Sequence, residues 1–217
     1  MKRAIIFANG KMEVAPSILA AIHTSDLIIA ADGGTQHCKS LKIKPNVIIG
    51  DFDSVSSLDI NSYQQAGVET IQYTTNKDET DLELALLYAL NHQTTHVYIF
   101  GALGKRWDMT IANILLGVQH RFSQLSIRLL DGRDELIILR GEGREDIMDR
   151  KGDTVSLIPV GGDALGITTD GMEYPLNDET LYLGSSRGVS NVIISDKSRV
   201  IIKTGTLLLC ISSREVY

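Results

Sequence analysis

The chain has 217 residues, of which 43% are hydrophobic and 22% are charged, and its formal net charge is −6. This acidic balance argues against a broad nucleic-acid-binding surface, which is normally basic. No stretch approaches the ~20 consecutive apolar residues of a membrane helix, and the N-terminal MKRAIIFANG leads into a strand pattern without a signal-peptide cleavage site. We therefore expect a cytoplasmic protein that binds neither nucleic acid nor membrane.

The cysteines and histidines show no metal-binding or catalytic pattern. Cys38 and Cys210 are far apart and lack CxxC spacing, which makes a zinc site or a disulfide framework unexpected. The histidines likewise lack metal-ligand or triad spacing.

From Met1 to about Asp131, short β-branched runs alternate with helix-like segments. Helical periodicity is clearest over residues 81–91 and 111–118. This alternation predicts βαβ units around a mainly parallel sheet, with helices on both of its faces. The expected strands are residues 4–8, 27–32, 46–51, 69–75, 96–102 and 125–131.

After about Gly132 the helical periodicity stops. Strand-like runs follow, separated by Gly, Asp, Asn and Ser turns at intervals typical of an antiparallel sandwich or barrel. We therefore expect an α/β domain over residues 1–131 and an all-β, sandwich-like domain over residues 132–217. The expected strands of this second half are residues 135–140, 153–160, 165–170, 180–186, 191–195, 199–205 and 206–212.

Charged side chains follow the C-terminal ends of strands in the first half. In an open parallel sheet these ends form the edge where ligands bind, so the loops should converge there. The residues are Asp32 after the second strand, Asp51 and Asp53 after the third, Asp78 and Asp81 after the fourth, and Arg106 and Asp108 after the fifth.

The segment VIIGDFDSV carries two carboxylates one residue apart. Asp51 and Asp53 should project the same way and Phe52 back to the interior, because residues i and i+2 share a side in extended chain. Mg²⁺ favours one or two carboxylates together with phosphate oxygens and water, so this pair suits a metal-bound nucleotide. The glycines at 33, 34, 101 and 104 should leave space for the ligand.

Each acid also has a purely structural alternative. Thr80 with Glu83 forms a capping-box pattern, Asp81 would suit the positive end of that helix, and Asp108 could be an N-cap. The convergence of several acids favours a site over these separate roles. The sequence has neither the GxxxxGK[ST] spacing of a P-loop nor a GxGxxG after the first strand, which argues against P-loop and dinucleotide-binding proteins.

An ordered series of motifs resembles the thiamine pyrophosphokinase family. The motifs are ADGG (31–34), GDFDS (50–54), NKDETDLELAL (76–86), GALGKRWD (101–108), GMEYPL (171–176) and GSSRGVSN (184–191). The resemblance implies an N-terminal α/β domain for ATP and Mg²⁺, a C-terminal β-sandwich, and a homodimer with active sites shared between subunits. It also implies the reaction of ATP with thiamine to give thiamine diphosphate and AMP.

The resemblance further implies roles for the strand-end residues. Asp51, Asp53 and Asp78 would hold Mg²⁺, and Asp81 would join them directly or through water. Lys77 and Arg106 would contact phosphates, and Asp32, Gly33 and Gly34 would border the nucleotide. Asp108 could accept the thiamine proton, bind the metal or orient Arg106.

In the second half, Ser190 and Asn191 match the family residues that hydrogen-bond the thiamine pyrimidine, although SRGVSN alone reads as a polar turn. Tyr174 stands where relatives place an aromatic side chain, which would favour the thiazolium cation. Met109 departs from the His or Gln expected there, and Tyr174 from the Trp of the animal type.

Other functional classes remain as alternatives. VIIGDFDSV also fits the strand-end signature of haloacid-dehalogenase-type phosphatases, in which Asp51 would be the nucleophile and Asp53 an acid/base. A non-catalytic nucleotide- or thiamine-binding module would explain a pocket, but not the number of metal-suited acids beside Lys77 and Arg106.

Overall fold

The computed structural model describes residues 1–13, 16–104 and 106–214. The chain divides into two compact units, Met1–Gly132 and Arg133–Tyr217. Among the described residues, no helix is both long and apolar enough to cross a membrane.

The first unit is built on a sheet whose strands lie in the order β6-β5-β1-β2-β3-β4. Each of its neighbouring pairs is parallel. These strands are β1 (Arg3–Phe7), β2 (Leu27–Ala31), β3 (Val47–Gly50), β4 (Glu69–Gln72), β5 (His96–Phe100) and β6 (Ser126–Asp131). All of the strands expected in the first half are therefore present.

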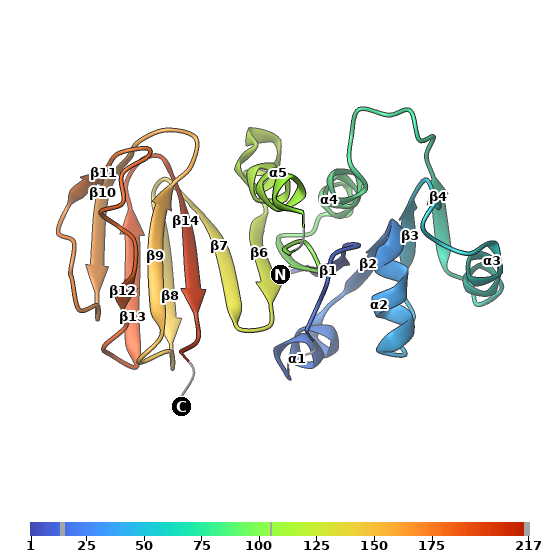
Figure 1. Cartoon of the computed structure of the whole chain (residues 1–217), viewed down its shortest axis with the longest axis horizontal. Coiled ribbons are helices and arrows are strands. Elements are labelled where there is room, and N and C mark those ends of the chain that lie inside the picture. The colour runs from blue at the N-terminus through green and yellow to red at the C-terminus, as the bar shows by residue number, and fades with distance from the viewer. Residues whose placement is uncertain (14–15, 105, 215–217) are drawn as a thin grey trace. The chain divides into compact units, whose positions relative to one another are not determined.

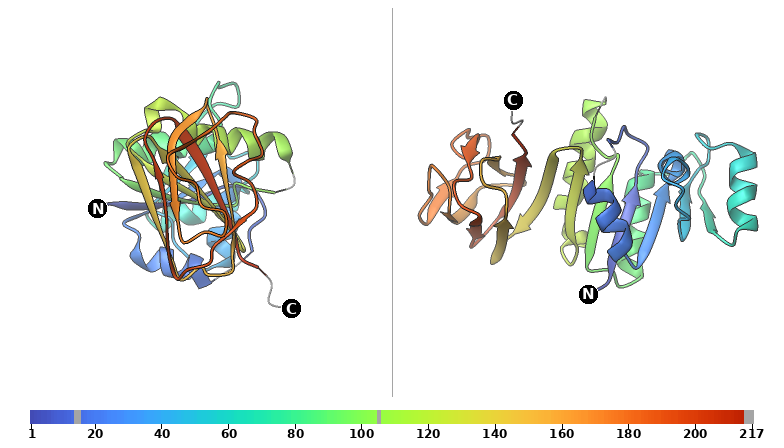
Figure 2. Two further views of the ribbon diagram at one scale, coloured as in Figure 1. Left: turned by 90° about the vertical axis from the view of Figure 1, so that its left-hand side faces the viewer. Right: turned by 90° about the horizontal axis from the view of Figure 1, so that it is seen from below.

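The helices of the first unit cover both faces of the sheet. Figures 1 and 2 show α1 and α2 on one face and α4 and α5 on the other. The helices are α1 (Pro16–Thr24), α2 (Thr35–Ser40), α3 (Ser57–Gln65), α4 (Asp81–Asn91) and α5 (Trp107–Val118), with short 3-10 turns η1 (Asp32–Gly34) and η2 (His120–Phe122).

The central strands are buried, as their continuous apolar runs predict. Ile5, Ile29 and Ile48 are fully covered. From β1 the chain proceeds to β2 on one side, whereas β5 lies on the other, so the strand order reverses at β1. Loops at the carboxyl ends of strands separate at such a reversal and leave a crevice for ligand.

The first turns of α4 and α5 show whether Thr80 and Asp108 are helix N-caps. Thr80 caps α4, because its hydroxyl accepts the backbone N–H of Glu83 at 3.2 Å. The Glu83 side chain forms an ion pair with Arg121. Asp108 is not an N-cap: α5 begins at Trp107, so Asp108 lies inside its first turn.

The second unit contains strands and turns throughout its described part. Neighbouring strands lie in the orders β12-β9-β14-β7 and β11-β10-β13-β8. The strands are β7 (Asp134–Arg140), β8 (Gly143–Met148), β9 (Thr154–Pro159), β10 (Ala164–Asp170), β11 (Glu179–Leu181), β12 (Asn191–Val192), β13 (Lys197–Ile202) and β14 (Thr206–Ser212).

Both groups of strands contribute to one hydrophobic cluster, which includes Leu157 of β9, Leu209 of β14, Ile167 of β10 and Val200 of β13. The all-β character expected for this half is present. Strand β8 was not expected, because its sequence GREDIM is mostly charged and polar. It is fixed by antiparallel pairing with β13.

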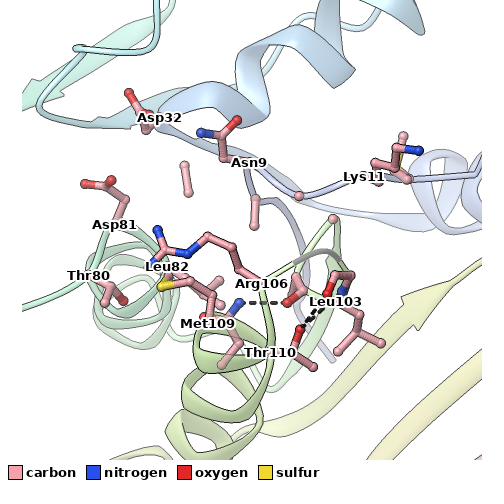
Figure 3. A pocket seen from close by; sticks show the side chains of 18 of the residues that line it. Asn9, Lys11, Asp32, Thr80, Asp81, Leu82, Leu103, Arg106, Met109 and Thr110 are labelled. Carbon is pink, nitrogen blue, oxygen red and sulfur yellow. Dashed lines mark hydrogen bonds between the residues drawn. The ribbon is translucent and has the colours of Figure 1, made fainter.

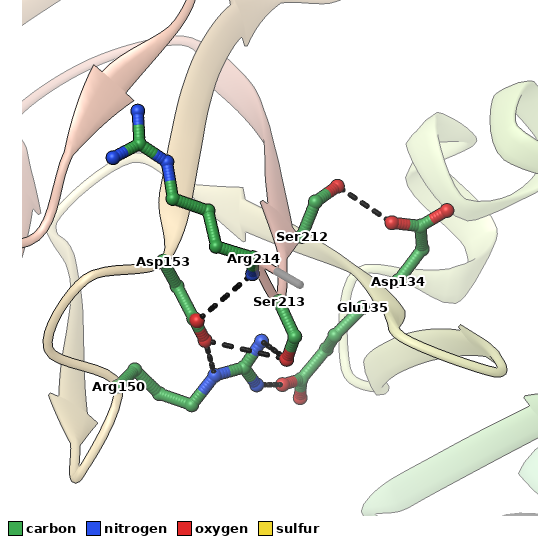
Figure 4. Close-up of polar contacts among 7 residues, drawn as sticks. All are labelled: Asp134, Glu135, Arg150, Asp153, Ser212, Ser213 and Arg214. Atoms are coloured by element: carbon green, nitrogen blue, oxygen red, sulfur yellow. Dashed lines mark hydrogen bonds and ion pairs between the residues drawn. The ribbon is translucent and has the colours of Figure 1, made fainter. Parts of the chain in front are cut away.

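An ionic cluster joins distant parts of the second unit (Figure 4). The Arg150 guanidinium pairs with Asp153 and, at 3.2 Å, with Glu135, and it also donates to Ser213 Oγ at 3.4 Å. The Arg214 N–H donates to Asp153 at 3.4 Å. The cluster therefore ties the end of β14 to β7 and to the turn before β9.

Candidate active site

A cavity of about 800 Å³ lies in the first unit, among the loops that follow its parallel strands (Figure 3). Its position matches the strand-order reversal at β1. Its walls come from residues 8–12 after β1, Ala31 and Asp32 at the end of β2, Asp51 after β3, parts of the segment 75–82, residues 101–104 after β5, and the first half of α5.

Three carboxylates converge beside this cavity. Asp32, Asp51 and Asp53 each place one oxygen within 4.8 Å of the others. Asp32 is 4% exposed, and its Oδ1 is buried without a hydrogen-bond partner. Within the described residues none of the three forms an ion pair, so a cation is the natural counter-charge for them.

The backbone around these acids is unusual. Phe52 has φ +65° and Asp32 has φ +43°, both in the left-handed region that ordinary side chains disfavour. Phe52 packs against the hydrophobic cluster of the first unit, while the Asp53 N–H donates to Asp51 Oδ1 at 3.1 Å. The turn thus places Phe52 inward and both carboxylates together, as predicted, but through a left-handed residue rather than through extended chain.

Lys77 and Asp81 both line the cavity and pair with each other. Lys77 Nζ lies 2.7 Å from Asp81 Oδ1. Burial raises the pKa of Asp81, Lys77 opposes that rise, and the negative charges of Asp32 and Asp51 add to it. Lys77 thus offsets part of the charge of a crowded group of acids.

Arg106 lines the cavity and is oriented by Asp108. Its Nε donates to Asp108 Oδ1 at 3.2 Å and its Nη2 to Oδ2 at 2.5 Å. This contact lowers the pKa of Asp108, although both side chains are exposed. Of the roles open to Asp108, orientation of Arg106 is the one with a contact in the structure.

Asp78 is the predicted metal ligand that the structure does not bring to the acidic group. It is exposed, it is absent from the cavity lining, and it is not grouped with Asp32, Asp51 and Asp53. Its role as a metal ligand stays a prediction.

The glycines of ADGG do not leave free space for a ligand, contrary to expectation. A Cβ added at Gly33 would lie 2.0 Å from Asn9 Oδ1, and one at Gly34 would lie 1.9 Å from the Phe7 carbonyl oxygen. The protein itself occupies that space, so nucleotide binding by Gly33 and Gly34 stays a prediction.

The two glycines after β5 differ from each other. A Cβ added at Gly101 would lie 2.7 Å from the Ala8 carbonyl oxygen, so this glycine serves close packing between loops rather than open space for a ligand. Gly104, by contrast, has open space around it, as expected.

Several lining residues were not predicted. Asn9 and Lys11 follow β1, His37 lies on α2, and Thr110 lies on α5. Asn9 and Lys11 could have been found, because they follow a strand as the selected acids do. His37 and Thr110 have no such signal, since they reach the cavity from helices.

In the second unit, two of the predicted thiamine-binding residues, Tyr174 and Asn191, help to line a small cavity of about 100 Å³. The Asn191 amide is already bonded: Oδ1 accepts the Tyr174 N–H at 3.0 Å and Nδ2 donates to the Tyr174 carbonyl at 2.7 Å. Tyr174 itself is 63% exposed. Ser190 is exposed, and its N–H donates to Ser156 Oγ at 3.0 Å.

The fold and the first-unit site together define a class: an α/β protein whose parallel strands end at a cavity bordered by grouped acids and by basic side chains. Two family models match the chain. "Thiamin pyrophosphokinase, catalytic domain" matches residues 19–129, and "Thiamin pyrophosphokinase, vitamin B1 binding domain" matches residues 140–209.

Individual proteins agree with these matches. Thiamine pyrophosphokinase of Bacillus subtilis (strain 168) is 31% identical over 210 residues, which cover 96% of this chain and 98% of that protein. A crystal structure of the B. subtilis protein superposes with a TM-score of 0.85 and covers 99% of this chain and 100% of its own. The structure from Geobacillus thermodenitrificans, 27% identical, gives a TM-score of 0.82 and covers 100% of this chain and 99% of its own.

The chain belongs to the thiamine pyrophosphokinase family. These matches favour neither the phosphatase nor the non-catalytic alternative.

Proposed function

We propose that this protein transfers the pyrophosphoryl group of ATP to the hydroxyl of thiamine, giving thiamine diphosphate and AMP. The thiamine oxygen forms a bond to the β-phosphorus, the bond from that phosphorus to the oxygen of the α-phosphate breaks, and the hydroxyl proton is released. Besides family membership, the observation that carries the proposal is the convergence of Asp32, Asp51 and Asp53 beside a cavity that Lys77 and Arg106 also line.

The acidic group fits Mg²⁺. An unpartnered buried oxygen on Asp32 next to two further carboxylates is costly unless a cation is present. We propose that Asp51 and Asp53 hold the ion, with Asp32 as a third carboxylate at this position and Asp78 as a further candidate. When bound, Mg²⁺ would offset negative charge on the phosphate oxygens.

The cationic side chains would position the triphosphate. Arg106 is held in a planar, two-bond contact by Asp108, which leaves its remaining N–H groups for phosphate oxygens. Lys77 would interact both with Asp81 and with the phosphates. Asp108, whose pKa is lowered by Arg106, is a poor base, so we assign it to orienting Arg106.

The second unit would form a β-sandwich that holds thiamine. The exposed ring of Tyr174 can lie against a thiazolium cation, and Ser190 can offer its hydroxyl to the pyrimidine. Because the Asn191 amide is bonded to the Tyr174 backbone, we propose that Asn191 acts by fixing Tyr174.

We further propose a cytoplasmic homodimer with shared active sites, as the family resemblance implies. Apolar side chains on one face of α5 support a partner surface: Trp107, Ile111 and Leu115 follow one another at helical spacing and are 77%, 56% and 48% exposed. Mass measurement in solution at several protein concentrations tests the dimer, and a monomer throughout would contradict it.

The reaction is tested by chromatography of nucleotides and thiamine esters after incubation with ATP, Mg²⁺ and thiamine. Equal amounts of AMP and thiamine diphosphate, both dependent on thiamine, are expected. Free phosphate in the absence of thiamine would instead support a phosphatase, and unchanged ATP with bound thiamine would support a binding module.

Asp51→Asn tests the role of the acidic group. It should abolish turnover and weaken Mn²⁺ binding measured by electron paramagnetic resonance, with thiamine affinity kept within about tenfold. Asp59→Asn is the control, because Asp59 lies on α3 and pairs with Lys39. Full turnover in Asp51→Asn would overturn the metal assignment.

A further inference from the structure

The imidazole of His37 forms a hydrogen bond with a neighbouring loop in the cavity wall. His37 is the third residue of α2, and its Nε2 lies 2.8 Å from the carbonyl oxygen of Gly10 in the loop after β1. A carbonyl oxygen can only accept, so Nε2 must carry the hydrogen. His37 therefore fastens one loop of the cavity to the helix that follows another.

The N–H group of Gly10 is also hydrogen-bonded, to the loop after β5. This N–H donates to the Gly101 carbonyl at 2.7 Å, and a Cβ added at Gly10 would lie 2.3 Å from that same oxygen. A Cβ added at Gly101 would in turn lie 3.1 Å from His37 Nε2. The loops after β1 and β5 thus touch backbone to backbone, and the imidazole closes the junction between them.

The residues on either side of Gly10 connect this junction between the loops to ligand binding. Asn9 and Lys11 both line the cavity (Figure 3). Asn9 lies over Gly33, immediately after Asp32 of the acidic group. Lys11 forms no ion pair within the part of the chain described, unlike the other cavity cations, so its charge is available to an anionic ligand.

We propose that His37 is a positioning residue for nucleotide binding: by holding the Gly10 carbonyl, it fixes Asn9 and Lys11 in the wall of the cavity. Without this hydrogen bond the loop after β1 keeps its pairing with Gly101 but loses its tie to α2. Asn9 and Lys11 then have to become ordered when the nucleotide binds. This loss of conformational entropy makes the binding free energy of the nucleotide less favourable. The inference rests on the proposed function, because it assigns the cavity to ATP.

Steady-state kinetics of two His37 variants test this positioning role. His37→Leu removes the donor and should raise KM for ATP about tenfold, with kcat lowered less and KM for thiamine within about twofold. His37→Gln places an N–H donor near the position of Nε2 and should restore KM for ATP to within about threefold of wild type.

The chain provides a matched control. His92 also contacts a backbone carbonyl, that of Tyr88, at 2.8 Å, but it lies at the end of α4 outside the cavity lining. His92→Leu should leave both KM values unchanged. An equal rise for ATP and thiamine in His37→Leu, or failure of His37→Gln to restore ATP binding, would overturn the positioning role.

A readout without turnover separates this inference from the reaction itself. Hydrogen exchange of the segment 8–13 should be faster in His37→Leu than in wild type and normal in His37→Gln. Calorimetry with Mg²⁺ and a non-hydrolysable ATP analogue should show the same order of affinities.

The outcomes for the reaction and for His37 are distinguishable. If wild type forms no thiamine diphosphate, the proposed function fails. If wild type is active and the exchange is unchanged in His37→Leu, only the role of His37 fails. Should His37→Leu not fold, His37→Asn, which is too short to reach Gly10, replaces it with the same expected result.

Discussion

Lys77 and Asp81 form an ion pair of 2.7 Å within the wall of the cavity, with side-chain exposures of 12% and 29%. Lys77 lies in the loop before α4, and Asp81 is the first residue of that helix. The family resemblance assigns Lys77 to phosphate and Asp81 to the metal, but the structure joins them. A nucleotide that draws Lys77 away would leave Asp81 facing Asp32 and Asp51, whose charges already act on it.

A double-mutant cycle measures this coupling. Lys77→Met, Asp81→Asn and the double variant should show a coupling free energy of about 1 kcal/mol in urea unfolding, because each single change leaves a partly buried partner without this contact. Lys77→Met should also lower kcat/KM for ATP at least about tenfold. Simple additivity of the two unfolding effects would show that the pair contributes no coupling.

The backbone of Phe52 gives a prediction of unusual sign. At most sites Gly destabilises relative to Ala, but Phe52 has φ +65°, which costs Ala about 1 kcal/mol and Gly almost nothing. Phe52→Gly should therefore unfold at higher urea than Phe52→Ala. Tyr63 packs against the same cluster from α3 and provides the control, since there the Ala variant should be the more stable. If the Ala variant is the more stable one at both positions, the backbone of Phe52 is not strained.

Asn191 should affect thiamine through Tyr174. Asn191→Asp can still accept the Tyr174 N–H but cannot donate to its carbonyl, so KM for thiamine should rise about tenfold while KM for ATP stays within about twofold. Asn46→Asp is the matched control, because Asn46 Oδ1 accepts the N–H of Ile28, a role that Asp keeps. Normal thiamine kinetics in Asn191→Asp would remove Asn191 from the site.

The ionic cluster of Arg150 should support the second unit. Arg150→Met removes the guanidinium that Asp153 and Glu135 share at 14% and 18% side-chain exposure, which should cost about 2 kcal/mol of unfolding free energy. Arg199→Met removes the more exposed contact with Asp146 and should change stability by no more than about 0.5 kcal/mol. Chemical denaturation of both variants distinguishes the two cases, and equal losses would show that burial does not matter here.

Residue patterns alone were enough to predict the strands of the first unit, the all-β second half and the grouping of Asp51 with Asp53. The strands depend on a short-range rule, apolar runs bounded by turn residues. The two carboxylates are kept together by their one-residue separation, although Phe52 between them is left-handed rather than extended. The rule that ligands bind at the carboxyl edge of a parallel sheet also brought Asp32 and Arg106 into the candidate site.

The partners of these residues, in contrast, follow from the three-dimensional fold. It placed Asp32 with the DFD carboxylates and joined Lys77 to Asp81. In the second unit it bonded the amide of Asn191 to the backbone of Tyr174.

The loops around the cavity were likewise fixed only by the fold. The space beside Gly33 is filled by Asn9, and His37 reaches Gly10 across 27 positions of sequence. Such contacts join the loop after β1 to the turn and helix that follow β2. Their geometry depends on how the whole sheet brings those segments together, which no local pattern of residues encodes.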